Sequence, residues 1–527
     1  MVTLMDERGS GSPAYRWYVL ALFTLVYVFN FVDRQIIVIL GPSLKAALNV
    51  GDAELGLLFG TAFALFYALF GLPLARLVDG WRRVTTLVGG LLVWSATTTL
   101  SAFVGSYGQL AALRTCVGIG EASASPAAFS ILQDYFPPQR RATALSIYGS
   151  GIYIGIGAAL AIGGGILALW AKYPEGGAPL GLAGWQAAYL AAGMPGLILA
   201  ILIALTVREP TRGASEGTPR APDRAALAGI PVDLALFVPG LATLVLRRIG
   251  AAPGTVRRHL ALLVALPFAT LAIVLATDPL LAPAKRVAIA HILGVPLTTN
   301  FVQWVALAIG IHAAAGWIAA LRVRAPGAAA VTVDNPVFRL LAIGGGVVSI
   351  AGYGMATFVF VYGRETLGLG PADGIVLGAI SCVAGGGGTV LGGVLADVTR
   401  RYGRWARLNV AIVAVFAAAA GYVWMLTTGS VAQFYAANVV ALTALAMWLG
   451  PVFATGQEEV GAAERGTATG LQFLATNLIG LGLGPYCVGL ASDATGHLGG
   501  AMLMSLLAVP VAAALFWTAA QKLKARG

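Results

Sequence analysis

An arginine and a glutamate lie inside a stretch of the chain that is otherwise mostly apolar or small. Arg114 and Glu121 are seven residues apart within the segment 107–132. In a helix both would fall on one face, about 10 Å apart along the axis. A charge in the middle of a bilayer costs roughly 3 kcal/mol, so such residues usually face a wet cavity or a partner. These two residues are therefore candidates for chemistry inside a membrane.

A second pair of charges, Asp33 and Arg34, interrupts the first long apolar segment, 17–40. If this helix is a neighbour of the one above, Asp33 can pair with Arg114. Arg34 can likewise pair with Glu121, which completes a charge-balanced quartet. A static salt-bridge cluster that only fixes helix packing is the alternative. We favour a transport role because ionisable residues inside a membrane usually mark a functional pathway.

The composition defines the class of protein that must position these charges. The chain has 527 residues, of which 58% are hydrophobic and 10% charged, with a mean hydropathy of +0.84. Apolar runs near 20 residues predict an all-α polytopic membrane protein, and they lack the alternation of a β-barrel. The net charge of +11 is assigned to an excess of Lys and Arg in cytoplasmic segments, not to nucleic-acid binding. Residues 1–12 carry no cleavable signal pattern, so the first span should be retained.

The apolar runs predict two groups of six spans, each about long enough to cross a bilayer. The first group is expected at 17–40, 55–78, 84–104, 107–132, 142–170 and 185–207. The second is expected at 338–362, 374–395, 408–427, 431–455, 467–491 and 501–520. The domain prediction is a cytoplasmic N-terminus (1–16), an N-terminal bundle (17–207), a linker with an insert (208–337), a C-terminal bundle (338–520) and a cytoplasmic tail (521–527).

The region between the two groups predicts an extra pair of helices. Segments 260–276 and 301–321 are each about long enough to cross the bilayer, with a position along the membrane as the alternative. Segment 232–246 is apolar but short and precedes several arginines, which favours an interfacial helix. His291 and His312 have no cysteine or carboxylate cluster beside them. We therefore expect no metal site here and no cofactor elsewhere.

A short pattern recurs about 320 residues later in the chain. Ala75–Asp79, followed by Arg83, matches Gly393–Asp397, followed by Arg404; Arg141-Ala-Thr-Ala likewise matches Arg465-Gly-Thr-Ala. The spacing indicates a duplicated unit, with two bundles that rock about a central site. An Asp at a helix end with an Arg on the next turn can bridge to neighbouring helices and hold a gate shut. Ordinary topogenic charge is the alternative. The gating candidates are Asp79, Arg83, Arg141, Asp397, Arg404 and Arg465.

These residues resemble two signatures of the major facilitator superfamily. Arg114 to Ala122 matches the fourth-helix signature Arg-x-x-x-Gly-x-Gly-Glu-Ala in full. Gly393 to Arg404 matches the loop signature Gly-x-Leu-Ala-Asp followed by Arg-x-Gly-Arg, whereas the first copy departs from it at Ala75 and Arg82. The resemblance implies the major facilitator fold, two six-helix bundles, here with an extra transmembrane pair between them.

Within the superfamily, three segments look most like the Spinster-like transporters: 29–35, 63–79 and 114–144. This resemblance implies alternating access, with Asp33 and Glu121 as proton-coupling acids and Arg34 as a substrate ligand, with Arg114 nearby. Animal members move sphingosine phosphate and lysophospholipids, which implies an amphipathic anionic substrate and protons as partners. The organic-anion symporters, which carry sugar acids, share the same charged motifs and stay open as the alternative.

Further polar and aromatic residues could line the cavity, although packing is the alternative for each. They are Tyr148, Tyr153, Tyr353 and Asn477 as substrate-binding candidates, with Trp448 and Gln472 also considered. We do not expect an enzyme, because no Ser/His/Asp arrangement or metal spacing is present. An uncoupled scramblase or a transporter-like sensor is the alternative of another class. We expect a monomer in the bacterial inner membrane, in contact with membrane lipid.

Overall fold

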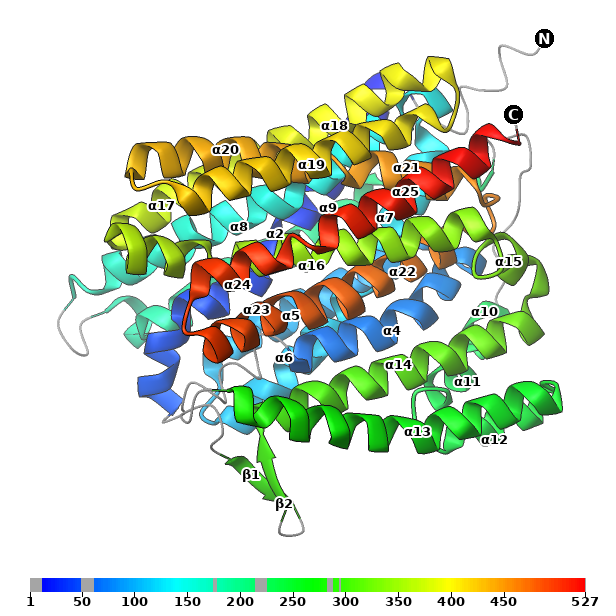
Figure 1. Ribbon diagram of the computed structural model, residues 1–527, viewed down its shortest axis with the longest axis horizontal. Helices are drawn as coiled ribbons and strands as arrows, with labels where there is room; N and C mark the ends of the chain where they lie inside the picture. The colour runs from blue at the N-terminus through cyan, green and yellow to red at the C-terminus, as the bar shows by residue number, and fades with distance from the viewer. Residues whose placement is uncertain are drawn as a thin grey trace.

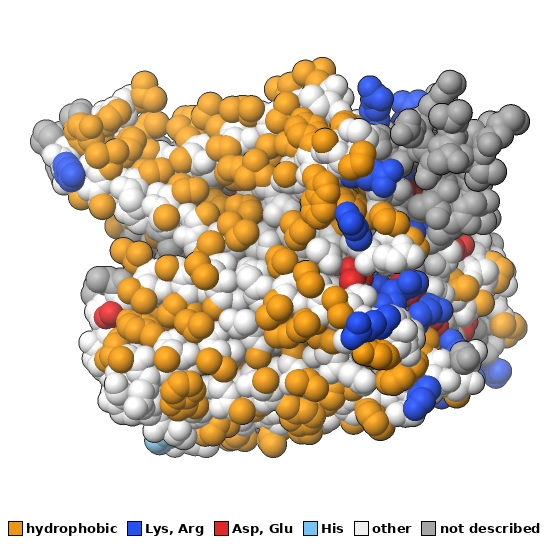
Figure 2. Space-filling model, turned by 90° about the horizontal axis from the view of Figure 1, so that it is seen from above, with side chains coloured by type: hydrophobic (Ala, Val, Ile, Leu, Met, Phe, Trp, Pro, Cys, Tyr) orange, Lys and Arg blue, Asp and Glu red, His pale blue; other side chains and the backbone are white. Residues whose placement is uncertain are grey.

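Long helices packed side by side make up the protein, as the computed structural model shows for residues 12–48, 61–173, 178–213, 225–281, 288–292 and 295–526 (Figure 1). Twelve of the helices in these ranges are long and apolar enough to cross a membrane. Apolar side chains cover the middle of the surface, while Lys and Arg gather at one end (Figure 2). The prediction of an all-α polytopic membrane protein is confirmed.

The N-terminal half begins with one helix of 36 residues and continues through helices of alternating direction. Its α-helices are α2 (Pro13–Leu48), α4 (Thr61–Gly80), α5 (Arg83–Leu100), α6 (Tyr107–Glu121), α7 (Ala124–Tyr135), α8 (Arg141–Trp170) and α9 (Gly184–Thr206). Short 3₁₀ turns, η1 (Ser101–Phe103), η2 (Pro138–Arg140) and η3 (Pro179–Gly181), join them.

The C-terminal half has the same succession of long elements, with more internal breaks. Its elements are α16 (Pro336–Leu367), α17 (Pro371–Ile380), η7 (Ser381–Gly385), α18 (Gly386–Thr399), η8 (Arg400–Tyr402), α19 (Ala406–Thr427), α20 (Val431–Ala446), α21 (Leu449–Glu458), α22 (Arg465–Ala475), η9 (Thr476–Leu481), α23 (Gly482–Thr495), α24 (Leu498–Ser505) and α25 (Ala508–Lys524). The elements η7 and η9 are π-helical, which kinks the helices that contain them.

The insert between the halves contains two long helices beside α4 (Figure 1). Its elements are α10 (Ala225–Ala228), α11 (Ile230–Ala235), α12 (Leu241–Arg248), α13 (Pro253–Thr277), η5 (Asp278–Leu280), the antiparallel pair β1 (Ala288–Ile292) and β2 (Val295–Thr298), α14 (Thr299–Arg324) and α15 (Pro326–Val331). Helices α13 and α14 contain the predicted segments 260–276 and 301–321, and both have the length and composition of membrane spans. Two short helices replace the single interfacial helix expected at 232–246.

The segment 107–132, expected as one span, is broken into α6 and α7 at Ala122 and Ser123. Pro126 follows the break, and proline supplies no N–H to the carbonyl one turn earlier. Each piece is shorter than a membrane, so the two pieces cross it only together. The break lies directly after Glu121, at the level of the buried charges.

Small residues bring the two halves together. Helix α8 packs on α18, and α4 packs on α22, so each half contributes its second and fifth long element to the interface. A Cβ on Gly157 of α8 would lie 2.9 Å from the carbonyl oxygen of Gly378 in α17. The run Gly385–Gly388 lies where helices cross, since Gly388 lies against the backbone of Thr443 and Gly385 against the ring of Tyr153.

Candidate transport site and gate

The four intramembrane charges form two buried ion pairs between α2 and α6. Arg34 Nε lies 2.7 Å from Glu121 Oε2, and Arg114 Nη1 lies 3.1 Å from Asp33 Oδ1. The Thr98 hydroxyl also donates to Asp33. Glu121 is fully buried, whereas 12% of the Arg34 side chain is exposed. The structure therefore brings together the quartet that the sequence predicts, with Arg34 as its most accessible member.

Aromatic rings surround the guanidinium group of Arg34. Its central carbon lies 4.8 Å from the ring centroid of Phe31, 4.7 Å from Phe63 and 4.5 Å from Tyr67. Each such cation–π contact contributes about 0.5 to 2 kcal/mol, depending on how well it is desolvated. The rings hold a charged, planar donor in one orientation, as recognition of an anion requires.

Several buried polar atoms of α2, α6 and η9 have no hydrogen-bond partner among the described residues. They include Arg34 Nη2, Glu121 Oε1, both amide atoms of Asn30 and Asn477 Oδ1. Buried polar atoms are usually paired with protein or with water, so the two unpaired atoms of the Arg34–Glu121 pair mark a place where something else can bind. The donor on Arg34 and the acceptor on Glu121 are suited to an anion and to a proton, respectively.

The other predicted ligands lie at different distances from the quartet. Tyr353 of α16 is within electrostatic range of Arg34 and Tyr67, and Tyr153 is in turn close to Tyr353. Tyr148 is fully buried and stacks on Tyr27 with ring centroids 4.4 Å apart. Tyr148 is also within electrostatic range of Arg34 and Tyr67, so Tyr353 and Tyr148 both lie near the quartet, and the ring of Tyr148 is in addition part of the packing.

Three remaining candidates belong to the C-terminal half. Asn477 donates through Nδ2 to the carbonyl of Phe473 at 2.7 Å and keeps its oxygen free among the described residues. Gln472 is buried beside Gly456. Trp448 stacks against Phe516, so it acts as a packing residue of the C-terminal core.

The space between the halves near Tyr67 is almost closed. A cavity lined by Tyr67, Pro126 and Phe473, among others, has a volume of about 10 Å³. This is close to the smallest space that holds one water molecule. The two halves therefore approach each other closely at this point.

Two carboxylates, both predicted to be gating residues, cap helices of the opposite half. Asp79, at the end of α4, accepts hydrogen bonds from the backbone N–H groups of Gly466 and Thr467, both at 2.6 Å. Asp397, near the end of α18, accepts from Thr143 N at 2.9 Å and from its hydroxyl at 2.8 Å. Each carboxylate thus meets the positive N-terminal end of α22 or α8. We call this end of the molecule, where α25 also ends, the gate end.

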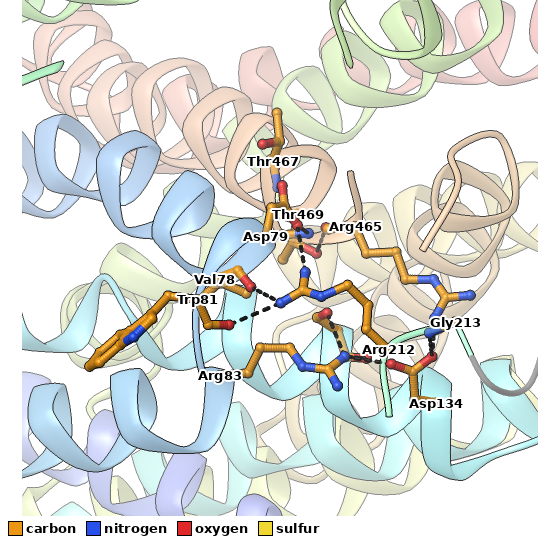
Figure 3. A network of polar contacts seen from close by, with 12 residues as sticks. Val78, Asp79, Trp81, Arg83, Asp134, Arg212, Gly213, Arg465, Thr467 and Thr469 are labelled. Carbon is orange, nitrogen blue, oxygen red and sulfur yellow. Dashed lines mark hydrogen bonds and ion pairs between the residues drawn. The ribbon is translucent and has the colours of Figure 1, made fainter. Parts of the chain in front are cut away.

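A buried ion-pair chain strengthens the first of these contacts (Figure 3). Arg83 Nη1 lies 2.5 Å from Asp134 Oδ2, and Arg465 Nη1 lies 2.7 Å from Asp134 Oδ1, with all three side chains fully buried. Arg83 also pairs with Glu209 at 2.8 Å. Arg212 reaches the same place and donates to the carbonyls of Val78 and Trp81. Asp134 therefore joins the two halves through Arg465.

A similar set of ion pairs in the C-terminal half is centred on Arg407, which was not among the predicted gating residues. Arg407 lies 2.7 Å from Glu458 and 2.8 Å from Asp397, and it is fully buried. Arg404, a predicted gating residue, is 44% exposed and pairs with Glu458 inside its own half. The other predicted gating residue, Arg141, is buried and donates to the carbonyl of Phe136 at 3.3 Å.

Sequence reasoning missed three residues of these ion-pair networks: Asp134, Glu458 and Arg407. A signal for the two acids was present, because Asp134 stands seven residues before Arg141 and Glu458 seven residues before Arg465. The duplicated pattern therefore extends further upstream than the matched residues.

Two similar halves of long apolar helices, with buried charges between α2 and α6 and mutual caps at one end, define a polytopic membrane protein of the two-bundle class. The sequence profile of the Major Facilitator Superfamily matches residues 23–485. The chain therefore belongs to this superfamily of transporters.

Comparisons with single proteins cover less of the chain. It is 31% identical over 217 residues to an MFS-type efflux pump of Mycolicibacterium smegmatis, a match that covers 41% of this chain and 46% of the pump. It is 28% identical over 215 residues to Protein spinster of Drosophila melanogaster, covering 41% of this chain and 33% of that protein. It is 27% identical over 203 residues to a probable galactarate/D-glucarate transporter of Bacillus subtilis, covering 37% of this chain and 42% of that protein. Each match spans less than half of the relative's length.

The fold as a whole is similar to that of solved transporters. A bacterial homologue of the human lysosomal transporter Spinster, in an inward-facing and unoccupied conformation, aligns over 97% of this chain and 98% of its own, with a TM-score of 0.57 and 23% identity. This similarity extends the two-bundle fold to nearly the whole chain.

Proposed function

We propose that this protein is a Spinster-like secondary active transporter that works by alternating access. It would be coupled to protons and move an amphipathic anion such as a lysophospholipid or a sphingoid phosphate. The observation that carries this proposal is the position of Arg34, which is paired with buried Glu121 and enclosed by three aromatic rings. The partial identity to Protein spinster supports the Spinster-like assignment.

In this proposal Arg34 exchanges one anionic partner for another. With Glu121 ionised, its carboxylate balances the guanidinium group. Protonation of Glu121 removes that negative charge and frees Arg34 for the headgroup of the substrate. Asp33, paired with Arg114, is the second acid through which a proton can pass. The exchange couples the two events because Arg34 balances either the carboxylate or the substrate anion.

The gate supplies the change of access in the same proposal. Lys and Arg side chains gather at the gate end (Figure 2), and such an excess is typical of the cytoplasmic side. We therefore assign the gate end to the cytoplasm, where the caps on α8 and α22 hold the halves together. Release of both caps would let the bundles rock and open this side.

The second candidate function is proton-coupled symport of a sugar acid. It is favoured by the identity to the probable galactarate/D-glucarate transporter, a match similar in length to the Spinster match. A sugar acid would need Arg34 for its carboxylate, but it would make less use of the surrounding rings than an amphipathic molecule. We rank it second for that reason.

The test is uptake into proteoliposomes of a labelled lysophospholipid and, separately, a labelled sugar acid, each with and without a pH gradient. We expect gradient-driven movement of the lysophospholipid and its loss in Glu121→Gln. Glu365→Gln removes an exposed carboxylate at the end of α16 and is the matched control. Movement of the sugar acid alone would establish the second candidate. Full proton coupling in Glu121→Gln would refute the role given to Glu121.

A further inference from the structure

The insert helix α14 lies along one of the two seams at which the halves meet. Near the middle of α14, a Cβ on its Gly310 would be 2.6 Å from Leu478 of η9. One turn further, Ala313 is buried in a cluster with Leu69 of α4 and Phe237. Helix α14 therefore touches the N-terminal half through α4 and the C-terminal half through η9, and it covers the line between them (Figure 1).

Polar contacts attach α14 to different halves at its two ends. Far from the gate, Gln303 Nε2 donates to the Gly482 carbonyl at 2.7 Å, and Trp304 Nε1 donates to the Tyr486 hydroxyl at 3.2 Å. Both acceptors belong to α23 of the C-terminal half.

At the gate end the attachment is to the N-terminal half. Buried Asp233 of α11 lies 2.7 Å from Arg76 of α4 and also pairs with Arg324 of α14. The insert is thus bonded to both halves and is not a loosely attached appendage.

The outer face of the insert is apolar and faces away from the protein. On α13, Phe268 is 70% exposed, Leu275 65% and Val264 55%. Behind it, Leu72 of α4 is only 1% exposed. A lipid tail in the bilayer therefore meets α13 and α14 instead of the seam between α4 and α23.

The opposite seam, between α8 and the pair α17–η7, is held differently. Gly157 approaches Gly378, and the Tyr153 ring packs on Gly385. Among the described residues, the hydrogen bonds from α8 to the C-terminal half lie at the gate end, from Thr143 to Asp397. Away from the gate, van der Waals contacts hold this seam.

An apolar groove opens on the bilayer side of η7. It has a volume of about 440 Å³ and is lined by Val376, Ile380, Val383, Gly387 and Val439, among others. Its volume is in the range of small-molecule pockets, and Val383 on its rim is 76% exposed. The groove lies between α20 and the elements α17, η7 and α18, so a hydrocarbon chain can bind to the elements of the C-terminal half that pack on α8.

From these contacts we propose that α13 and α14 form a lateral wall that keeps the α4–α23 seam closed to the bilayer throughout transport. A substrate with an apolar tail then passes between the membrane and the quartet through the seam between α8 and α17–η7. This inference rests on the proposed function, since it concerns the route of an amphipathic substrate.

The first test labels the route directly. A lysophospholipid with a photoactivatable diazirine at the end of its tail is incorporated into liposomes that contain the protein, and labelled peptides are identified by mass spectrometry after illumination. We expect label on residues 150–160 of α8 and 375–388 of α17 and η7. Label on residues 65–72 of α4 or 476–486 of η9 and α23 would overturn the proposal.

The second test locks the wall in place. Cys116, Cys382 and Cys487 are first replaced by Ala, and cysteine pairs are introduced as Leu69→Cys with Ala313→Cys, or as Gly310→Cys with Leu478→Cys. Each pair is cross-linked with a short bifunctional reagent, and the same protein without cross-linking is the control. We expect uptake of the lysophospholipid to stay within twofold after either lock.

The two failures can be told apart. Loss of lysophospholipid uptake in either locked protein, with uptake of a tail-free glycerophosphodiester unchanged, would overturn the wall. If the unlocked protein moves no lysophospholipid under any gradient, the proposed function fails. In that case the diazirine experiment still shows which seam lipid tails reach.

Discussion

Arg465 of the C-terminal half and Asp134 of the N-terminal half form a fully buried ion pair, with Arg465 Nη1 2.7 Å from Asp134 Oδ1. Asp134 also holds Arg83 of its own half at 2.5 Å. Charges in such surroundings are costly to expose singly, because a buried group that loses its partner keeps its desolvation penalty. The pair therefore stabilises the closed gate end specifically, since it forms only when the halves meet there.

Replacement of this arginine should open the gate end. Arg465→Gln removes one of the two arginines paired with Asp134, so the closed state should lose about 1 to 3 kcal/mol, the usual cost of an unsatisfied buried polar group. Distances between spin labels placed at the gate end of each half would show a larger open population. Arg404→Gln is the control, because Arg404 is 44% exposed and pairs within its own half. Equal shifts in the two variants would contradict this role of Arg465.

The two helix caps should contribute independently to closure. Asp79→Asn and Asp397→Asn each remove one charged cap, which should weaken the closed state by about 0.5 to 2 kcal/mol. Because the caps serve different helices, the double variant should show nearly the sum of the two effects. The rate at which a soluble maleimide labels Ala468→Cys, at a buried position of α22, reports opening. A double variant no faster than either single one would show that the caps do not act separately.

Lysine should not replace the central arginine. Arg34→Lys keeps the positive charge but loses the planar guanidinium that lies against Phe31, Phe63 and Tyr67. We expect substrate uptake to fall about tenfold or more, equivalent to about 1.4 kcal/mol or more. Arg364→Lys, at an exposed arginine near the end of α16, should leave uptake unchanged. Normal uptake by Arg34→Lys would contradict the prediction that uptake requires the guanidinium group enclosed by the rings.

The attachment of the insert should depend on pH. Burial raises the pKa of the Asp233 carboxyl above its ordinary value of 3.8, while Arg76 and Arg324 act in the opposite direction. The folded protein therefore binds this proton more tightly than the unfolded chain. The resulting stabilisation is complete below pH 3.8 and is lost as the pH rises through the higher folded-state value.

Asp233→Asn cannot ionise, so it should not show this loss. Its Tm relative to that of the unaltered protein should rise as the pH passes upward through the same window, as measured by thermal unfolding in detergent. Asp334→Asn affects a carboxylate that is 45% exposed and pairs with Arg322, and it serves as the control. A Tm difference that stays constant with pH for Asp233→Asn would contradict the prediction.

The quartet could be predicted from the sequence because each charge stands alone in an apolar segment and has few possible partners. An unpaired charge is costly inside a membrane, so Arg34 and Glu121 were expected to pair with each other. The buried role of Asp134 could not be predicted in the same way. It stands at the polar end of a span, where a carboxylate is ordinary, and its partner Arg465 is 331 residues away in the sequence.

The lengths of the apolar segments predicted the long helices of the insert but not which helices of the two halves they contact. Nothing in the composition of segment 301–321 indicates that Gly310 meets Leu478 or that Ala313 meets Leu69. These contacts depend on the shape of two surfaces far apart in the sequence. The break between α6 and α7 was also missed, although Pro126 could have indicated it.

The mutual caps at the gate end have a consequence for the history of a duplicated chain. Asp79 caps a helix of the C-terminal half, and Asp397 caps a helix of the N-terminal half. A substitution in either half therefore affects contacts of both halves. At the gate end, the sequence of one half therefore cannot change independently of the other. The central charges are different, since Asp33, Arg34, Arg114 and Glu121 all belong to the first half. The contacts at the gate end must therefore evolve together in both halves, whereas the central charges can change within the first half alone.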